Sequence, residues 1–403
     1  MQSNETRHIL FFLHNSVSEL YVGLPILWFL KKHMDVKIHF VSEDKKILER
    51  LKVQDSYVKI MEELGEFHFG NVKVLNLLGY MFFTQKNIIS FSCFSGMKKI
   101  EKVFYFLLKK LKKVFYPHSF ALYPSGEYIK GDQYKKLLDD RQNDFKKRFG
   151  VNYNYLLLNR EDEKKFYSLR GWSEEKLIAI VPFGYYEEWI SKLNLYEKRK
   201  SDDKIRVFVA LRNYNKHALT KENYEVLIEH LFNVFKEFKN FDFIVKPHPR
   251  QTDINTLQKK LQIYDNVLVS NQSPYEIIKQ SDLTVALWGS VIQDSIALDT
   301  PAVEFHIHHT SHPQVYKNSD GEFVSLYEAY GIVDRLDNAK DLIEYLNSLD
   351  KDKLEKIYSK QKKLINEIYN LNDDKEIDKM VNIFENIFNT ETKFMTKFKE
   401  LVS

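Results

Sequence analysis

Short apolar runs alternate with longer stretches of helical periodicity along most of this chain. The run His8–Leu13 is followed by a helical stretch around Trp28, and Val36–Val41 returns to the period-two alternation of a strand. The same rhythm begins again at Ile205–Leu211 and continues to Phe305. Strands that alternate with helices in this way are typical of parallel, doubly wound sheets. We therefore predict an α/β protein with two Rossmann-like domains and a helical C-terminal tail.

A polar, charged break, EKRKSDDK at Glu197–Lys204, separates the two halves. Linkers between domains commonly have such a composition. The predicted domains are therefore 1–196, an N-terminal acceptor-binding domain, and 205–370, a C-terminal domain for a nucleotide donor. Residues 371–403 are expected to form a charged helical tail that packs back across the domains.

Three elements are expected between the first strands and the middle of the chain. Val72–Leu78 and Ile88–Phe91 have the pattern of strands, and Lys98–Tyr116 has that of a lysine-rich amphipathic helix. Basic amphipathic helices are typical of segments that lie on membrane surfaces, so contact with a membrane is expected there. A helix that packs on the sheet with solvated lysines is the alternative.

The composition is that of an ordinary globular protein and excludes several functions. Hydrophobic residues make up 44% of the 403 residues, and the net charge of +4 provides no field for nucleic-acid binding. The single cysteine, Cys93, excludes an internal disulfide and fits a reducing cytoplasm. The sequence has neither the pattern of a signal peptide nor that of a membrane-spanning segment. A cytoplasmic protein is expected, either soluble or peripheral on the inner face of the cytoplasmic membrane.

The string IVKPHPRQ, Ile244–Gln251, carries the clearest chemistry. A buried strand brings Lys246, His248 and Arg250 to its carboxyl end, where open α/β sheets bind ligands. Two prolines, one of them Pro249, hold the backbone around the histidine extended. Three potential cations within five residues suit a diphosphate or a nucleotide phosphate. A polar strand end with a solvated histidine is the alternative.

Further positions in the second half extend the expected donor site. Within Ser281–Phe305, a tight turn at Gly289 and Ser290 offers backbone N–H groups and a hydroxyl to an anion, although every βαβ unit contains such a turn. Arg212 follows the first strand of the second domain, where a guanidinium would stabilise a leaving diphosphate. Glu304 ends a later strand and could accept hydrogen bonds from ribose hydroxyls. A surface salt bridge for Arg212 and buried pairing for Glu304 are the alternatives.

The histidine-rich string HIHHTSH, His306–His312, raises the question of a metal site. His306 and His308 would share one strand face, but no nearby carboxylate or cysteine completes a ligand set. We expect this segment to line a ligand cleft instead, with no bound metal and no cofactor besides the donor substrate.

The strings KPHPR and SDLTVALWGSVIQD together resemble the CDP-glycerol glycerophosphotransferase family of teichoic acid polymerases. They also resemble the wider GT-B capsule and lipopolysaccharide glycosyltransferases with an HP motif, including Kdo transferases and bacterial sialyltransferases. The resemblance covers Lys246–Glu304, with Trp-Gly-Ser where Tyr-Ser-Ser is usual, so that Gly289 replaces a serine hydroxyl. It implies the GT-B fold, a cleft between two facing sheets, no metal requirement, and contacts of His248 and Ser290 with the donor's phosphates.

The catalytic base has two candidates in the first half. The resembling family carries a His-Gly pair whose histidine is assigned as the base, and here His118 is followed by Ser119 in place of the glycine. A histidine with a pKa near neutrality suits removal of a proton from an acceptor hydroxyl. A structural histidine in a turn is the alternative. Glu19, between the first strand and the first helix, competes for the role, but it could equally cap the helix.

The expected function is that of a GT-B transferase in the synthesis of bacterial capsule, lipopolysaccharide or teichoic-type glycan. Its donor would be a nucleotide sugar or a CDP-polyol, with cytidine favoured by the resemblance, and its acceptor a glycan or a lipid-linked saccharide. A nucleotide-sugar epimerase of the same fold and a non-catalytic component of a polysaccharide assembly complex are the rival hypotheses.

Overall fold

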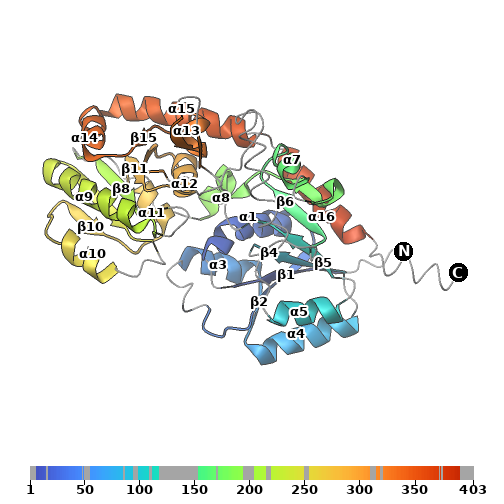
Figure 1. Ribbon diagram of the computed structural model, residues 1–403. Coiled ribbons are helices and arrows are strands. Elements are labelled where there is room, and N and C mark those ends of the chain that lie inside the picture. The colour runs from blue at the N-terminus through green and yellow to red at the C-terminus, as the bar shows by residue number, and fades with distance from the viewer. Residues whose placement is uncertain are drawn as a thin grey trace. The chain divides into compact units, whose positions relative to one another are not determined.

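The computed structural model describes residues 6–14, 17–47, 49, 55–84, 87–93, 99–108, 111–117, 153–168, 171–193, 204–214, 219–248, 254–308, 315–317, 321–371, 373 and 375–390. The described residues fold into two compact units (Figure 1). The first unit contains those up to Pro117, Tyr153–Leu193 and the C-terminal helix, and the second contains Lys204–Leu371.

The first unit is built on a parallel sheet with the strand order β3-β2-β1-β4-β5-β6-β7. Its strands are β1 (Arg7–Phe12), β2 (Val36–Ser42), β3 (Gly65–Phe69), β4 (Asn87–Ser92), β5 (Lys112–Phe115), β6 (Tyr155–Leu158) and β7 (Leu177–Ala179). The order reverses between β1 and β4, which makes the carboxyl ends of these two strands the topological switch point. The run ILFF of β1 is buried throughout because helices cover both faces of the sheet.

The helices of the first unit pack their apolar stripes on the two faces of this sheet. They are α1 (Val17–His33), α3 (Asp55–Leu64), α4 (Asn71–Thr84), α5 (Lys99–Leu107), α7 (Glu163–Ser168), α8 (Glu187–Lys192) and α16 (Lys375–Asn389), with 3₁₀ turns η2 (Glu174–Lys176) and η3 (Phe183–Tyr185). On one face, Val74 and Leu77 of α4 and Phe104 of α5 pack against Leu10 and Phe12 of β1. The helices α4 and α5 lie side by side in Figure 1.

Two of the predicted elements are wrong. The expected strand Val72–Leu78 is part of helix α4, because its buried side chains recur at helical spacing. Those side chains are Val74, Leu77, Leu78 and Met81. The single helix expected over Lys98–Tyr116 is instead α5 followed by β5. The second half pairs with β4 and β6 in the sheet, where Val114 and Phe115 are buried, so tertiary pairing overrides the local helical pattern.

The second unit is built on a parallel sheet with the order β10-β9-β8-β11-β12-β15. Its strands are β8 (Arg206–Ala210), β9 (Asp242–Lys246), β10 (Val267–Val269), β11 (Leu283–Ala286), β12 (Ala302–Phe305) and β15 (Arg335–Leu336), and β13 (Val315–Lys317) pairs with β14 (Phe323–Ser325) in a separate antiparallel hairpin. The helices are α9 (Lys221–Glu237), α10 (Ile254–Leu261), α11 (Pro274–Lys279), α12 (Val291–Ala297), α13 (Leu326–Ala329), α14 (Ala339–Asn347) and α15 (Lys351–Tyr369). The order reverses between β8 and β11. Two doubly wound parallel sheets confirm the predicted fold class.

The C-terminal helix α16 returns to the first unit. Phe384 of α16 packs edge-on against Phe91 of β4, and Glu385 forms an ion pair of 3.2 Å with Arg7 of β1. The chain therefore passes from the first unit to the second and returns to the first with α16. Most of the predicted linker Glu197–Lys204 lies outside the described residues. Among the described helices, none is long and apolar enough to cross a membrane.

Candidate functional site

Four neighbouring strands of the second unit end at one edge of the sheet, and each carries a polar residue there. These residues are Lys246 at the end of β9, Arg212 after β8, Ser290 after β11 and Glu304 near the end of β12. Because the four strands are parallel and adjacent, their carboxyl ends share one edge. The switch point between β8 and β11 lies at the middle of this edge, between Arg212 and Ser290.

Arg212 is the central cation of this edge. Its Nη1 donates a hydrogen bond of 3.4 Å to the carbonyl oxygen of Trp288, and its guanidinium carbon lies 4.5 Å from the centre of the indole ring. Burial lowers the pKa of Arg212, while Tyr327 and Glu304 nearby oppose the shift. The pKa of an arginine starts so high that the group stays charged at neutral pH. The edge therefore holds a half-buried, oriented positive charge.

The turn after β11 has a strained backbone. Trp288 adopts a φ of 67° and Gly289 a φ of 128°, and a bulky residue such as tryptophan seldom takes a positive φ. A Cβ on Gly289 would lie 3.1 Å from Nη1 of Arg212, so a side chain there would meet both steric and backbone strain. Ser290 forms the N-cap of α12 but makes no capping hydrogen bond with its side chain. Strained turns of this kind concentrate at ligand sites.

Glu304 is a fully buried carboxylate beside this turn. Its Oε2 accepts a hydrogen bond of 2.7 Å from the Ser325 hydroxyl and lies 3.2 Å from Nε2 of His308. Its Oε1 has no hydrogen-bond partner among the residues that the structure describes. His306, which is fully buried, and His308 both pack against the indole ring of Trp288, at 5.3 and 5.8 Å between ring centres.

The expectation that no carboxylate lies near these histidines is wrong. His308, Glu304 and Glu328 of α13 each offer a ligand atom, all within 4.8 Å of one another. Both carboxylates already have protein partners, since Arg335 lies 3.6 Å from Glu328 and Ser325 donates to Glu304. The residues His309–His312 of the histidine-rich string lie outside the described part of the chain.

The sequence Pro247–Pro249, called the PHP segment below, directly follows β9. Lys246 is half-buried, and burial lowers its pKa while Glu276 opposes the shift. His248 follows two residues later and is also half-buried. One strand, β8, separates β9 from β11, so about 10 Å separates the PHP segment from Ser290 at the usual strand spacing. Pro249 and Arg250 lie outside the described residues.

A second polar cluster lies at the switch point of the first unit. The backbone N–H of His14, just after β1, donates a 2.9 Å hydrogen bond to Oε2 of Glu19 in α1. The ring Nε2 of His14 lies 2.8 Å from Oε2 of Glu101 in α5, and its Nδ1 lies 3.4 Å from Glu19. All three side chains are buried. Burial alone would lower the pKa of His14, but the two hydrogen-bonded carboxylates outweigh it and raise the pKa to about 9.

Sequence reasoning identified one member of this cluster and missed two. Glu19 was expected as a base at the cleft edge, and the structure buries it completely against His14. His14 could have been found, because it is the first polar residue after a buried strand. Glu101 gives no such signal, since it stands among lysines in a helix. His118, the first choice for the base, lies outside the described residues.

No protein-family model and no curated protein matches the chain. Solved structures do match over nearly its whole length. UDP-GlcNAc 2-epimerase from Neisseria meningitidis, bound to UDP-GlcNAc, has a TM-score of 0.56 at 12% identity over 94% of this chain and 100% of its own. A glycosyltransferase from Rickettsia africae has a TM-score of 0.55 at 13% identity over 96% and 100%. The wall teichoic acid polymerase TagF has 0.52 at 13% over 94% and 88%. At these identities the likeness shows the fold, and it confirms the predicted GT-B fold.

Proposed function

We propose that this chain is a GT-B transferase that moves a sugar or a polyol phosphate from a nucleotide-activated donor to a glycan or lipid-linked acceptor. The observation that carries the proposal is the arrangement around Arg212. A half-buried cation stacks on Trp288 at a switch point, beside a strained turn in which a side chain at position 289 would crowd Arg212. An anionic ligand is the natural partner of such a charge.

The proposed donor site assigns a role to each group at this edge. Arg212, Lys246, His248, Pro249 and Arg250 form the part of the site that binds the nucleotide phosphates. The turn at Gly289 and the hydroxyl of Ser290 complete the phosphate site, while the free Oε1 of Glu304 accepts a hydrogen bond from a ribose hydroxyl. The bond from the phosphate oxygen to the transferred group breaks, and negative charge grows on that oxygen. The cations therefore bind the transition state more tightly than the ground state.

The acceptor hydroxyl must lose its proton as its oxygen forms the new bond. We assign this step to His118, because an imidazole with an ordinary pKa changes charge near neutral pH. Glu19 is the weaker choice because its carboxylate is fully buried and hydrogen-bonded to His14. We propose that Glu19 positions His14 instead. The proposed chemistry needs no metal, since the cations and the turn stabilise the leaving phosphate.

A screen of nucleotides by thermal unfolding tests this proposal. The purified protein is heated with CMP, CDP, UMP, UDP or GDP at saturating concentration. We expect a cytidine or uridine nucleotide to raise Tm by about 5–10 °C, the shift that a ligand at 100 times its Kd gives a domain of this size. If none of the five nucleotides raises Tm, the donor site does not exist, and a non-catalytic role in polysaccharide assembly is favoured.

An epimerase is the second candidate, because UDP-GlcNAc 2-epimerases are among the solved structures with the same fold. Incubation with a sugar derivative of the nucleotide that raises Tm, without any acceptor, separates the two reactions. An epimerase converts it to a second nucleotide sugar without any acceptor, whereas a transferase forms no such isomer. Nuclear magnetic resonance of the anomeric proton distinguishes these outcomes.

We also propose that the enzyme contacts an anionic membrane surface through α4 and α5 of the first unit, at the cytoplasmic face of the inner membrane. These two helices expose large apolar side chains, with Phe83 83%, Phe106 78% and Val72 69% exposed. Lys73 and Lys102 are exposed on the same two helices. Apolar side chains beside lysines suit the boundary between headgroups and acyl chains.

Sedimentation with liposomes that contain phosphatidylglycerol tests this surface. We expect Phe83→Ser with Phe106→Ser to lower the partition coefficient at least about 10-fold, because burial of each phenylalanine contributes about 1.5–3 kcal/mol. The matched control is Ile263→Ser with Leu268→Ser, which removes two exposed apolar side chains of 73% and 62% exposure from the second unit. Equal losses in the two double variants would contradict the assignment of this surface.

A further inference from the structure

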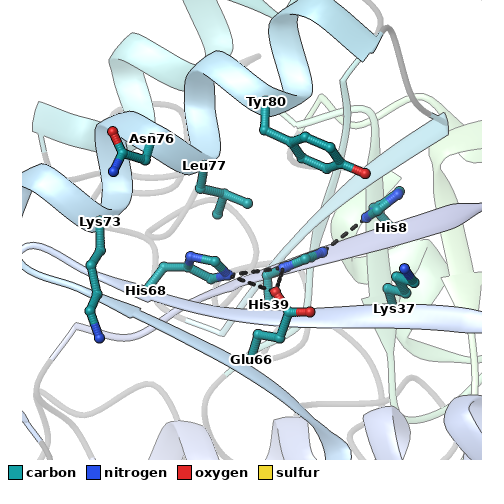
Figure 2. Close-up of a pocket in the computed structure, with 9 residues that line it drawn as sticks. All are labelled: His8, Lys37, His39, Glu66, His68, Lys73, Asn76, Leu77 and Tyr80. Carbon is teal, nitrogen blue, oxygen red and sulfur yellow. Dashed lines mark hydrogen bonds and ion pairs between the residues drawn. The ribbon is translucent and has the colours of Figure 1, made fainter.

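A second group of histidines lies in the first unit, on the face of the sheet that α4 covers. It lines a pocket of about 400 Å³ between the strands β1, β2 and β3 and the helix α4 (Figure 2). The lining residues are His8, Lys37, His39, Glu66, His68, Lys73, Asn76, Leu77 and Tyr80. His8 and Lys37 stand near the amino ends of their strands, whereas His14 follows the carboxyl end of β1. The pocket is therefore distinct from the carboxyl edge, and the proposed transfer reaction uses none of its residues.

Strand pairing brings three potential ligands together. In the parallel register, His39 of β2 is opposite Glu66 of β3, and His68 follows two residues later on the same face. Nδ1 of His39 lies 3.1 Å from Nε2 of His68 and 3.6 Å from Oε2 of Glu66. The third distance, between Nε2 of His68 and Oε2 of Glu66, is 3.4 Å.

These separations match the coordination sphere of a small transition-metal ion. With bonds of about 2.0–2.1 Å, two ligands of a tetrahedral zinc ion lie about 3.3–3.4 Å apart. The three measured distances between ligand atoms, 3.1, 3.4 and 3.6 Å, are close to this separation. One ion could therefore contact His39, Glu66 and His68 with little movement of the side chains.

His8 provides the support that a metal-binding imidazole requires. Its Nδ1 lies 2.9 Å from Nε2 of His39, and the two rings are nearly parallel, at 16°, with 5.2 Å between their centres (Figure 2). When His39 binds a metal through Nδ1, its Nε2–H donates to Nδ1 of His8. Ligating histidines commonly donate their second N–H in this way, which fixes the tautomer and the ring plane.

Burial disfavours the charged form of both imidazoles in the cluster. Burial, together with His8, His68 and Lys37 nearby, lowers the pKa of His39 to about 3. Burial also lowers the pKa of His68, although Glu66 opposes the shift and Lys73 adds to it.

We propose that His39, Glu66 and His68 bind one divalent transition-metal ion, zinc by preference. Two imidazoles and one carboxylate suit zinc better than magnesium or calcium, which prefer sets of oxygen ligands. This site departs from the sequence expectation of no metal. The ion would connect the edge strand β3 to β2 and so stabilise the first unit.

Titration of zinc into the protein, freed of metal with EDTA and without an affinity tag, tests the site by calorimetry. We expect one zinc ion per chain and a Tm that zinc raises. Glu66→Gln and His68→Gln should each weaken zinc binding at least about 10-fold. The Glu66 side chain is 66% exposed, so its substitution leaves the fold intact. Cobalt added in place of zinc should give the visible bands of a four- or five-coordinate ion, and both variants should lose them.

The matched controls are Glu62→Gln and His33→Gln, which change exposed residues of the same types in the same unit and should bind zinc like the wild type. No saturable zinc binding, or equal affinity in Glu66→Gln, His68→Gln and the wild type, would overturn the site. If only the variant His308→Gln failed to bind zinc, the ion would bind in the second unit, and the proposed site would be wrong. Nucleotide-induced stabilisation should persist in Glu66→Gln, which separates this test from that of the donor site.

Discussion

Replacing Arg212 by alanine is expected to weaken binding of the donor nucleotide by about 10- to 150-fold and to lower kcat/KM by roughly 10²- to 10³-fold. A hydrogen bond to a charged group contributes about 1.5–3 kcal/mol, and the half-buried guanidinium is already oriented by its stacking on Trp288. The effect on the reaction is larger because charge grows on the departing phosphate. Calorimetry with the nucleotide and steady-state kinetics measure the two effects.

Arg206 provides a matched control for this substitution. It stands at the amino end of the same strand, β8, and lies 3.6 Å from Asp242 rather than near Trp288. Arg206→Ala should therefore leave the Kd for nucleotide unchanged. Arg212→Lys should recover only part of the affinity, since an ammonium cannot stack on the indole or present two parallel donors. Equal nucleotide affinity in Arg212→Ala and the wild type would contradict the proposed donor site.

Replacing His14 by glutamine is expected to lower the free energy of unfolding of the first unit by about 3–5 kcal/mol. The substitution removes the imidazolium but leaves the carboxylates of Glu19 and Glu101 buried and close together. Urea unfolding followed by tryptophan fluorescence suits the measurement, because Trp28, Trp172 and Trp189 lie in the first unit.

The stabilisation that His14 contributes to the first unit should decrease as the pH rises. Its pKa is about 9 in the folded protein against 6.5 for an ordinary histidine in water, so the folded state holds the proton more tightly. The stabilisation is therefore complete below about pH 6.5 and is lost as the pH rises to about 9. The difference between the two pKa values corresponds to a loss of about 3 kcal/mol in the free energy of unfolding as the pH rises through this range. The difference in stability between the wild type and His14→Gln should shrink by that amount between pH 6 and pH 9.5.

Two further variants test this explanation. In the double variant His14→Gln with Glu101→Gln, removal of one buried charge should restore part of the lost stability. His33→Gln changes an exposed histidine of the same unit and should have no effect. A stability difference that stays constant from pH 6 to pH 9.5 would show that His14 does not carry the charge assigned to it.

The second half of the chain was the more predictable from sequence, for a physical reason. Its strands are short apolar runs bounded by proline, glycine and polar residues, so their ends are marked in the sequence. Arg212, Lys246 and Glu304 stand at or just after such ends. Parallel strands bring those ends to one edge, and a sequence therefore predicts that the residues meet there. The left-handed backbone of Trp288 could not be predicted, because glycine is the usual residue at a positive φ.

The remaining features depend on contacts between distant segments. Glu101 reaches His14 across 87 positions of the chain, and no local pattern marks a glutamate within a lysine-rich helix. The apolar run Val72–Leu78 fits a strand and a helix almost equally, and only its packing on β1 decides the outcome. His39 and His68 meet because β2 and β3 pair in one particular register. A shift of one residue would place them on opposite faces of the sheet.

A crystal structure with the nucleotide that raises Tm most tests the central proposal directly. We expect phosphate oxygens within hydrogen-bond distance of the Arg212 guanidinium and the turn at Gly289 and Ser290, with a ribose hydroxyl near Oε1 of Glu304. A nucleotide bound elsewhere, with the Arg212 guanidinium still stacked on Trp288 and no phosphate beside it, would contradict the account.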